Sequence, residues 1–151
     1  MNPTRVTVID DDRDVLDLFV DLLGEYGFSV ETYSDALPGI DQLIASRPNL
    51  IIVDLALAPE REQLTGAQVI HSARSSAELR DVPVIVSSAA TDLLAQQWPE
   101  LMARGDVQRL EKPFDLVTFE RVVETALGMG HGGLGTYPAD GREDLPRSVH
   151  D

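Results

Sequence analysis

Five side chains in this sequence could together carry out phosphoryl chemistry if the fold brings them to one place. Asp10 and Asp11 follow the run RVTVI, Asp54 follows LIIV, Ser88 comes two residues after VPVIV, and Lys112 lies in RLEKPFD. Carboxylates a few ångströms apart repel one another without a counter-charge, and an all-oxygen site with open positions suits Mg²⁺. One carboxylate could then attack a phosphoryl group whose oxygens are stabilised by the metal, a hydroxyl and an ammonium.

Lys112 is the only lysine, and every other basic side chain apart from the histidines is an arginine. An ammonium is a compact, strongly hydrated point charge, whereas a guanidinium is a planar fork. The two therefore do not exchange freely where one cation must reach one oxygen. Chance is the alternative explanation for a single lysine. If the position has a function, Lys112 could pair with Asp54 at rest and with a phosphoryl oxygen after transfer.

The elements that must position these residues are strands alternating with helices. Runs of β-branched and apolar residues predict strands at 5–9, 28–33, 50–53, 82–86 and 107–110. Helical periodicity predicts a first helix from about residue 14 to Gly24 or Gly27 and a third from Gly66 or Ala67 to residue 75. It also predicts helices at about 37–46, at 91–104 with a break at Pro99, and at 116–126 with Asp115 as the cap. This alternation predicts an α/β fold with a doubly wound, five-stranded parallel sheet and helices on both faces. Ligands of such sheets bind at the carboxyl ends of the strands, where the five polar side chains would lie.

The length and composition predict a single intracellular domain. A chain of 151 residues can bury one core, and the absence of cysteine excludes disulfides and thiolate metal sites. The three histidines are too scattered to suggest a zinc cluster. No signal-peptide or membrane-spanning run is present, so we expect a cytoplasmic protein without membrane contact. The net charge of −14 argues against binding nucleic acid through phosphate contacts.

The composition changes near residue 127. Residues 128–151 are rich in glycine and proline and lose apolar periodicity, so we expect a disordered tail after a folded domain at residues 1–127. The tail has two arginines against four acidic residues, a charge of −2, which leaves −12 on the folded part.

Four short motifs resemble those of the receiver domain of two-component response regulators, of the stand-alone, chemotaxis-receiver-like kind. They are VIDDD after the first strand, IIVDL at the third, VPVIVSSA at the fourth and EKPF after the fifth. The resemblance covers residues 5–127 and implies the flavodoxin-like strand order 2-1-3-4-5. It implies signal transduction in a phosphorelay, in which a sensor histidine kinase or phosphotransfer protein donates a phosphoryl group. The phosphoprotein, a monomer or weak homodimer, would then bind an unknown downstream protein differently.

The same resemblance assigns roles to individual residues. The protein ligands of Mg²⁺ would be the side chains of Asp10, Asp11 and Asp54 and the backbone carbonyl of Ala56. Asp54 would also be the phosphoacceptor that becomes an aspartyl phosphate. Ser88 takes the family's Ser/Thr position, and Lys112 takes that of its lysine, which precedes a proline whose peptide bond is usually cis. Such a domain is not an enzyme, except that it assists its own phosphorylation and dephosphorylation.

Three features depart from the family pattern. The stretch from Asp54 to Gly66 is several residues longer than the usual loop, and it is either a surface loop or a partner contact. Arg109 stands where most receivers have Tyr or Phe, so the domain would signal through the surface of its fourth helix or would not switch. Ala56 and Ala90 are small at two positions that influence hydrolysis of the acyl phosphate, so the sequence does not predict its lifetime.

Two other functions stay open on the sequence. A pseudo-receiver, which binds partners without switching by phosphorylation, would explain Arg109 and the altered loop but not the complete set of polar residues at the strand ends. A metal-dependent phosphohydrolase would need a second acid shortly after Asp54, where Ala56 stands instead. The chain could also be a fragment of a longer regulator.

Five further polar or aromatic residues have simpler explanations than a role in catalysis. Asp12 and Asp14 would serve the N-terminus of the first helix, whose dipole favours negative charge. Ser87 would end the fourth strand, and His71 would be a surface residue of the third helix. Trp98 would be a packing anchor at the predicted helix break.

Overall fold

The computed structural model describes residues 3–34, 39–54, 66–89, 91–103, 107–130 and 134, without the side chains of residues 91, 93 and 94. Strands and helices alternate along this part of the chain. The strands are β1 (Arg5–Ile9), β2 (Ser29–Tyr33), β3 (Leu50–Val53), β4 (Val84–Ser88) and β5 (Val107–Glu111). The helices are α1 (Arg13–Gly24), α2 (Ile40–Ser46), α3 (Gly66–Arg74), α4 (Thr91–Met102) and α5 (Leu116–Ala126). Within these ranges no helix is both long and apolar enough to cross a membrane.

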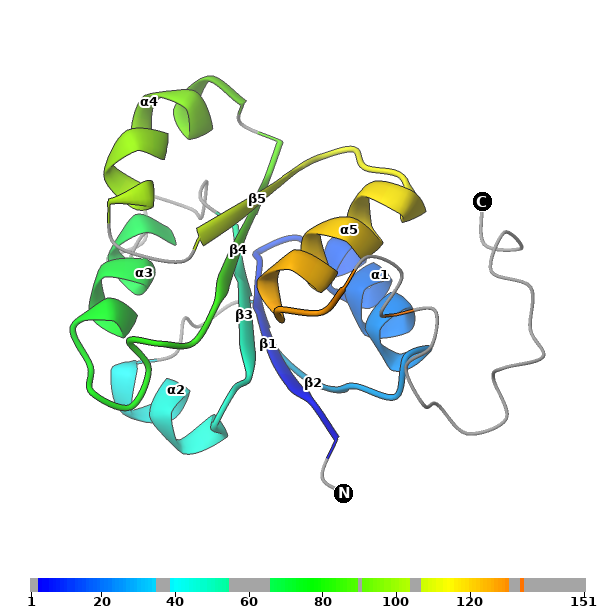
Figure 1. The fold of residues 1–151 in the computed structure, drawn as a ribbon, viewed down its shortest axis with the longest axis horizontal. Helices are drawn as coiled ribbons and strands as arrows, with labels where there is room; N and C mark the ends of the chain where they lie inside the picture. Colours follow the sequence, from blue (N-terminus) through cyan, green and yellow to red (C-terminus); the bar gives the residue numbers. More distant parts are fainter. Residues whose placement is uncertain are drawn as a thin grey trace.

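The strands form one parallel sheet in the order β2-β1-β3-β4-β5. Helices α1 and α5 cover one face, and α2, α3 and α4 cover the other (Figure 1). The predicted strand order, parallel pairing and placement of helices on both faces are therefore confirmed. Because all the strands run in one direction, their carboxyl ends lie along one edge of the sheet.

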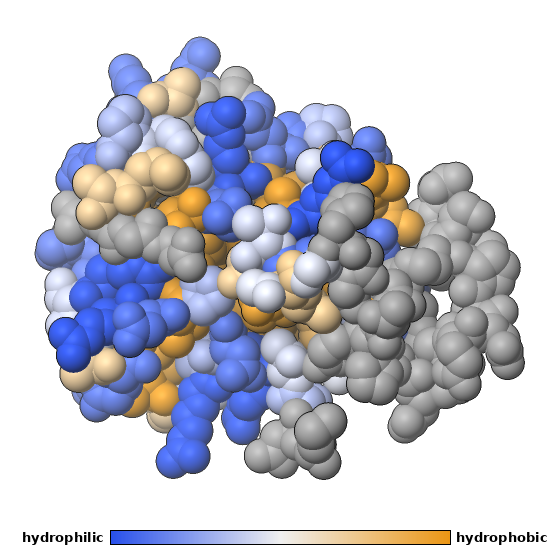
Figure 2. Space-filling model, viewed as in Figure 1, coloured by the Kyte–Doolittle hydropathy of each residue, from blue (hydrophilic) through white to orange (hydrophobic). Residues whose placement is uncertain are grey.

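Two apolar cores lie on the two faces of the sheet, and β3 contributes to both. Leu50 and Ile52 pack with the core under α1 and α5, whereas Ile51 and Val53 pack with the core under α2, α3 and α4. This alternation follows from the two-residue period of a strand, and burial on both faces explains the unbroken apolar run. Figure 2 shows hydrophilic residues over much of the outer surface, with apolar residues in the gaps between them.

Three phenylalanines hold the loop after β5 against α1 and α5. The ring of Phe114 lies 5.7 Å from that of Phe19 and 5.9 Å from that of Phe119, measured between centroids. The peptide bond between Lys112 and Pro113 is cis, as the resemblance implied. The aromatic contacts fix the backbone two residues after Lys112, so the path of the chain that carries the lone lysine is set by the core.

Aspartates cap two of the helices, as predicted. The carboxylate of Asp12 accepts hydrogen bonds from the N–H groups of Asp14 (2.9 Å) and Val15 (3.4 Å) at the start of α1. The carboxylate of Asp115 accepts from the N–H of Thr118 (2.7 Å) at the start of α5. Each cap satisfies donors that the helix itself cannot pair.

Two predicted elements on the chain differ from the structure. The fourth strand begins at Val84 and continues through Ser88, rather than ending at residue 86. Helix α4 runs through Pro99 without a break, because the contacts of Trp98 and Leu101 with the core of the sheet hold both sides of the proline in one helix. The predicted start of the second helix at residue 37 lies outside the described residues.

Leu134 belongs to the core under α1 and α5, although the sequence places it in the expected tail. Its side chain is 1% exposed. Its N–H donates to the carboxylate of Glu124 on α5 (3.1 Å), and Glu124 is itself buried. Residues 128–130 of the predicted tail are also described, and Met129 packs against the same core. The rest of that prediction falls on residues outside those described.

Candidate functional site

The candidate site lies at the carboxyl edge of the sheet, where backbone hydrogen bonds extend the strand ladders by one residue. These bonds run from the N–H of Asp10 to the carbonyl of Tyr33 (3.1 Å), from Asp54 to Ile9 (2.9 Å) and from Lys112 to Ser88 (3.0 Å). Asp10, Asp54 and Lys112 are thus each tied to the neighbouring strand through the backbone, independently of their side-chain contacts. The sheet itself therefore sets the spacing of the polar side chains.

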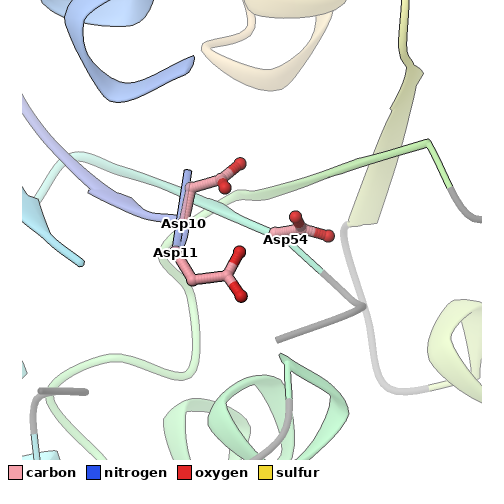
Figure 3. A group of neighbouring side chains, drawn as sticks. All are labelled: Asp10, Asp11 and Asp54. Carbon is pink, nitrogen blue, oxygen red and sulfur yellow. The ribbon is translucent and has the colours of Figure 1, made fainter. Parts of the chain in front are cut away.

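Three carboxylates meet at this edge. Carboxylate oxygens of Asp10, Asp11 and Asp54 all lie within 4.8 Å of one another. Figure 3 shows the first two side chains at the end of β1 and the third at the end of β3. Asp10 is 1% exposed and Asp54 8% exposed, whereas Asp11 is open to solvent. The structure thus brings together the three acidic side chains that the sequence singled out.

The ammonium of Lys112 bridges two of these carboxylates. Its Nζ lies 2.6 Å from Oδ2 of Asp10 and 3.3 Å from Oδ2 of Asp54. The second oxygen of Asp10, Oδ1, accepts the N–H of Asp12 at 2.9 Å. The expected contact with Asp54 is present, but the shorter contact is with Asp10, which the sequence did not indicate.

Burial and pairing act in opposite directions on the pKa of each buried partner. Burial raises the pKa of Asp10, and the charge of Asp54 adds to this, so the net shift is upward although Lys112 and the N–H of Asp12 favour the carboxylate. Burial alone would lower the pKa of Lys112, but its hydrogen bonds and the charges of Asp10 and Asp54 raise it overall. The ammonium is therefore fully charged at neutral pH.

The donor set at this edge fits a hard divalent cation. Three carboxylates and one ammonium leave a formal charge of −2, and all the available ligand atoms are oxygens. Magnesium prefers one or two carboxylates with several waters, and exposed Asp11 leaves room for water. The backbone carbonyl of Ala56, which the resemblance implied as a protein ligand beside the carboxylates, lies outside the described residues. The same is true of Ala90 and of the whole long loop at 55–65.

Two serines end β4 next to the site. Ser88 is fully buried and is the last residue of the strand. Its backbone carbonyl accepts the hydrogen bond from the backbone N–H of Lys112. Ser87 is also buried, and within the described part of the chain its hydroxyl has no hydrogen-bond partner. Ser88 is therefore the residue that ends β4, two positions beyond the predicted end of that strand, and Ser87 precedes it within the strand.

The comparison with protein families gives a match over most of the chain. The family model described as "Response regulator receiver domain" matches residues 6–124. This chain belongs to that family. Response regulator MprA of Mycobacterium sp. (strain KMS) is 32% identical over 114 residues, which are 76% of this chain but 46% of that protein. The chain thus spans about half the length of this relative.

Other similar proteins cover more of the receiver chain. Protein Rrf1 of Nitratidesulfovibrio vulgaris (strain Hildenborough) is 28% identical over 144 residues, 95% of this chain and 91% of Rrf1. The solved receiver domain of the sensor histidine kinase PA1611 from Pseudomonas aeruginosa PAO1, with magnesium in its active site cleft, superposes with a TM-score of 0.66. It is 21% identical and covers 84% of this chain and 99% of its own, which shows a common fold.

A cavity beside Lys112 was missed by the sequence reasoning. It has a volume of about 350 Å³ and is lined by Val15, Leu18, Ala89, Lys112, Pro113 and Phe114. Leu18 continues the helical apolar pattern of α1, but this residue is 46% exposed. The buried stripe of α1 is narrower than the apolar pattern suggested, and its edge forms a wall of the cavity. The apolar residues Val15 and Leu18, at the edge of that stripe, were the available signal of the cavity in the sequence.

Arg109, which replaces the usual aromatic residue of a receiver domain, contacts α4. Its guanidinium carbon lies 5.4 Å from the centre of the Trp98 ring, a cation–π arrangement, and its Nε lies 3.8 Å from Glu111. Trp98 packs against the core of the sheet, which confirms its predicted role as an anchor. The pair therefore joins β5 to α4 on the surface of the domain.

Proposed function

We propose that this receiver domain is a cytoplasmic phosphoacceptor that takes a phosphoryl group from a histidine kinase or phosphotransfer protein onto Asp54. The observation that carries the proposal is the cluster of Asp10, Asp11 and Asp54 with the ammonium of Lys112 between two of them. Phosphorylation would then change how the domain binds a downstream protein. It can do so only as far as the phosphoryl group interacts differently with two states of the domain.

In the proposed transfer, a carboxylate oxygen of Asp54 attacks the phosphorus of the donor's phosphohistidine. A new O–P bond forms, and the bonding pair of the broken N–P bond returns to the imidazole nitrogen. The Nζ of Lys112 is already 3.3 Å from Oδ2 of Asp54, so its ammonium can pair with a phosphoryl oxygen once the group is bound to Asp54. The hydroxyl of Ser88, at the end of the adjacent strand, would donate to another phosphoryl oxygen.

Asp10, Asp11 and Asp54 would hold Mg²⁺, with the carbonyl of Ala56 as a further ligand. When bound, the ion supplies positive charge at the phosphoryl oxygens. Asp10 has a second task in this arrangement: both its oxygens are engaged, one by Lys112 and one by the N–H of Asp12. It therefore positions the ammonium and the start of α1 relative to the acceptor.

The cavity beside Lys112 is our candidate contact for the phosphodonor. Its walls include exposed Leu18 of α1 and Phe114, and it opens next to the lysine. An apolar side chain of the donor in this cavity would bring its histidine to the strand ends. We expect Leu18→Glu to slow transfer from a kinase or phosphotransfer protein but to leave labelling by acetyl phosphate unchanged.

The decisive experiment is the intact mass of the chain after incubation with acetyl phosphate and Mg²⁺. We expect addition of one phosphoryl group in the wild type and in Asp12→Asn, and none in Asp54→Asn. Asp12→Asn is the matched control because asparagine caps a helix as well as aspartate does. Equal labelling of the Asp54→Asn variant would show that Asp54 is not the phosphoacceptor.

A pseudo-receiver is the second candidate, because Arg109 lies on Trp98 in place of the family's aromatic residue. This function predicts that the domain binds partners without a phosphorylation-dependent change. NMR spectra of the labelled and unlabelled chain separate the two candidates. A chain that takes up the phosphoryl group but shows no change beyond the strand ends would be a pseudo-receiver.

A further inference from the structure

A second pocket lies between α3 and α4, on the face of the sheet opposite α1 and α5. The two helices are neighbours on that face (Figure 1). The pocket has a volume of about 200 Å³ and is lined by Ala67, Gln68, His71, Gln97, Glu100 and Leu101. None of these residues belongs to the carboxylate cluster or to the cavity beside Lys112.

The lining residues have helical spacing on both helices. Gln68 and His71 are three apart on α3, and Gln97 and Glu100 are three apart on α4, so each pair lies on one side of its helix. Leu101 is buried and supplies an apolar floor. The result is a small pocket with an apolar base and four polar side chains that reach it from two helices.

One acceptor at this pocket lacks a partner. Oε1 of Gln97 is buried and has no hydrogen-bond partner among the residues that the structure describes. A buried acceptor without a donor costs free energy, and such groups in folded proteins call for an explanation. The terminal torsion of a glutamine side chain is broad, so a small rotation would turn this oxygen toward a donor in the pocket. A ligand with hydrogen-bond donors would satisfy it.

The charge of the pocket selects the type of donor. Glu100 contributes a carboxylate, the two glutamines contribute amide oxygens, and the chain as a whole has a net charge of −14. Gln68, His71 and Glu100 each already take part in an interaction. A ligand must therefore bind these side chains in addition to their present partners or replace those partners. A planar guanidinium, with five donors, can contact several acceptors at once, and its methylene stem can lie on Leu101.

We propose that the pocket between α3 and α4 binds an arginine side chain presented by a partner protein. The partner would dock on the α3–α4 surface, on residues that are not part of the carboxylate cluster. The proposal rests on the pocket, its acceptors and its charge, and it does not depend on phosphorylation. A partner could therefore stay bound here while the strand-end site is loaded and emptied.

The test is an NMR titration of the full chain with N-acetyl-arginine amide at about 0.15 M ionic strength, where the Debye length is ~8 Å and diffuse attraction is weak. We expect saturable shifts of the backbone amides at 66–71, 97, 98, 100 and 101 and of the Gln97 side-chain amide. The uncharged analogue N-acetyl-citrulline amide should produce none. Shifts spread over the acidic surface, shifts centred on Asp54, or no saturable shift at the solubility limit of the ligand would each overturn the proposal.

Two variants with equal loss of charge complete the test. Glu100→Gln keeps the shape of the side chain but removes its charge, and it should weaken binding at least about fivefold, because hydrogen bonds to charged groups are roughly twice as strong as neutral ones. Asp17→Asn removes the same charge from an exposed position on α1 and should leave the affinity unchanged. Equal affinities of wild type and Glu100→Gln for N-acetyl-arginine amide would show that the charge of Glu100 does not contribute to binding the guanidinium in the pocket.

Discussion

Removing the lone ammonium should destabilise the folded state, and Lys112→Met tests this. The variant keeps the length of the side chain but leaves Asp10, Asp11 and Asp54 without their cation. At 2.6 and 3.3 Å, the two contacts of Nζ correspond to about 6 and 5 kcal/mol of attraction at an effective dielectric constant of about 20. The desolvation of the charged groups offsets much of this.

Measured losses on breaking a buried ion pair are about 3–5 kcal/mol. Because the Lys112 side chain is 15% exposed and so keeps some contact with water, we expect a loss near the lower end, about 3 kcal/mol. The assay is urea unfolding followed by circular dichroism at neutral pH in EDTA. The matched control is Arg121→Met, which removes a cation from the exposed side of α5 and should stay within about 0.5 kcal/mol of the wild type.

The loss should depend on pH in a defined direction. The pKa of Asp10 is already raised by burial, and removal of Lys112 raises it further, so the variant's Asp10 becomes protonated as the pH falls. The cost of its buried charge is present above its folded-state pKa and disappears below it. The difference between wild type and Lys112→Met should therefore shrink on acidification. Mg²⁺ should stabilise the variant more than the wild type, because it replaces the missing charge.

The reasoning would be refuted by a Lys112→Met variant that is as stable as Arg121→Met in EDTA at neutral pH. An equal response of wild type and variant to Mg²⁺ would separately show that the lysine and the metal do not neutralise the same carboxylates. Either result would make the single lysine an accident of composition.

Further predictions concern the caps and the C-terminal contact. Leu134→Ala should lower the free energy of unfolding by about 2–5 kcal/mol in urea unfolding, whereas exposed Val117→Ala should change it little; an equal effect of the two would place Leu134 outside the core. Asp12→Ala should cost about 0.5–2 kcal/mol by the same measurement, and Asp12→Asn much less, because only alanine removes the cap. Hydrogen bonds from Thr118 lower the pKa of Asp115 below 3.8, the value in the unfolded chain. Its carboxylate therefore stabilises the fold above that pH, and the contribution is lost as the pH falls through the folded-state pKa. In acid unfolding curves, the stability advantage of the wild type over Asp115→Asn should vanish.

The strands and the gathering of the acidic residues were predictable from local sequence. β1 and β3 begin and end where their β-branched runs begin and end, at 5–9 and 50–53, and each is followed at once by an aspartate. Parallel strands bring their carboxyl ends to one edge, and the strand order that the resemblance implied puts β1 beside β3, so Asp10 and Asp54 were expected to lie close together. The caps Asp12 and Asp115 follow equally from local rules.

Helix α4 and the C-terminal contact were not predictable in this way, because distant contacts override the local signal. Pro99 is a helix breaker in isolation, yet the packing of Trp98 and Leu101 on the sheet keeps α4 continuous. Leu134 stands among glycines, which favour disorder, yet its burial and its bond to Glu124 join it to the core. In both cases the stabilising contacts are made with the core of the folded domain, so local composition did not reveal them.

By itself, the sequence determined which residues end the strands and therefore which side chains could form one acidic, lysine-containing site. Only the tertiary structure decided how those side chains pair. The closer partner of Lys112 is Asp10, 102 positions away, and the choice depends on the path of the loop that Phe114 anchors between α1 and α5. Strand ends are set by local backbone preference, whereas an ammonium selects between two carboxylates by differences of less than an ångström that the packing of the whole domain determines.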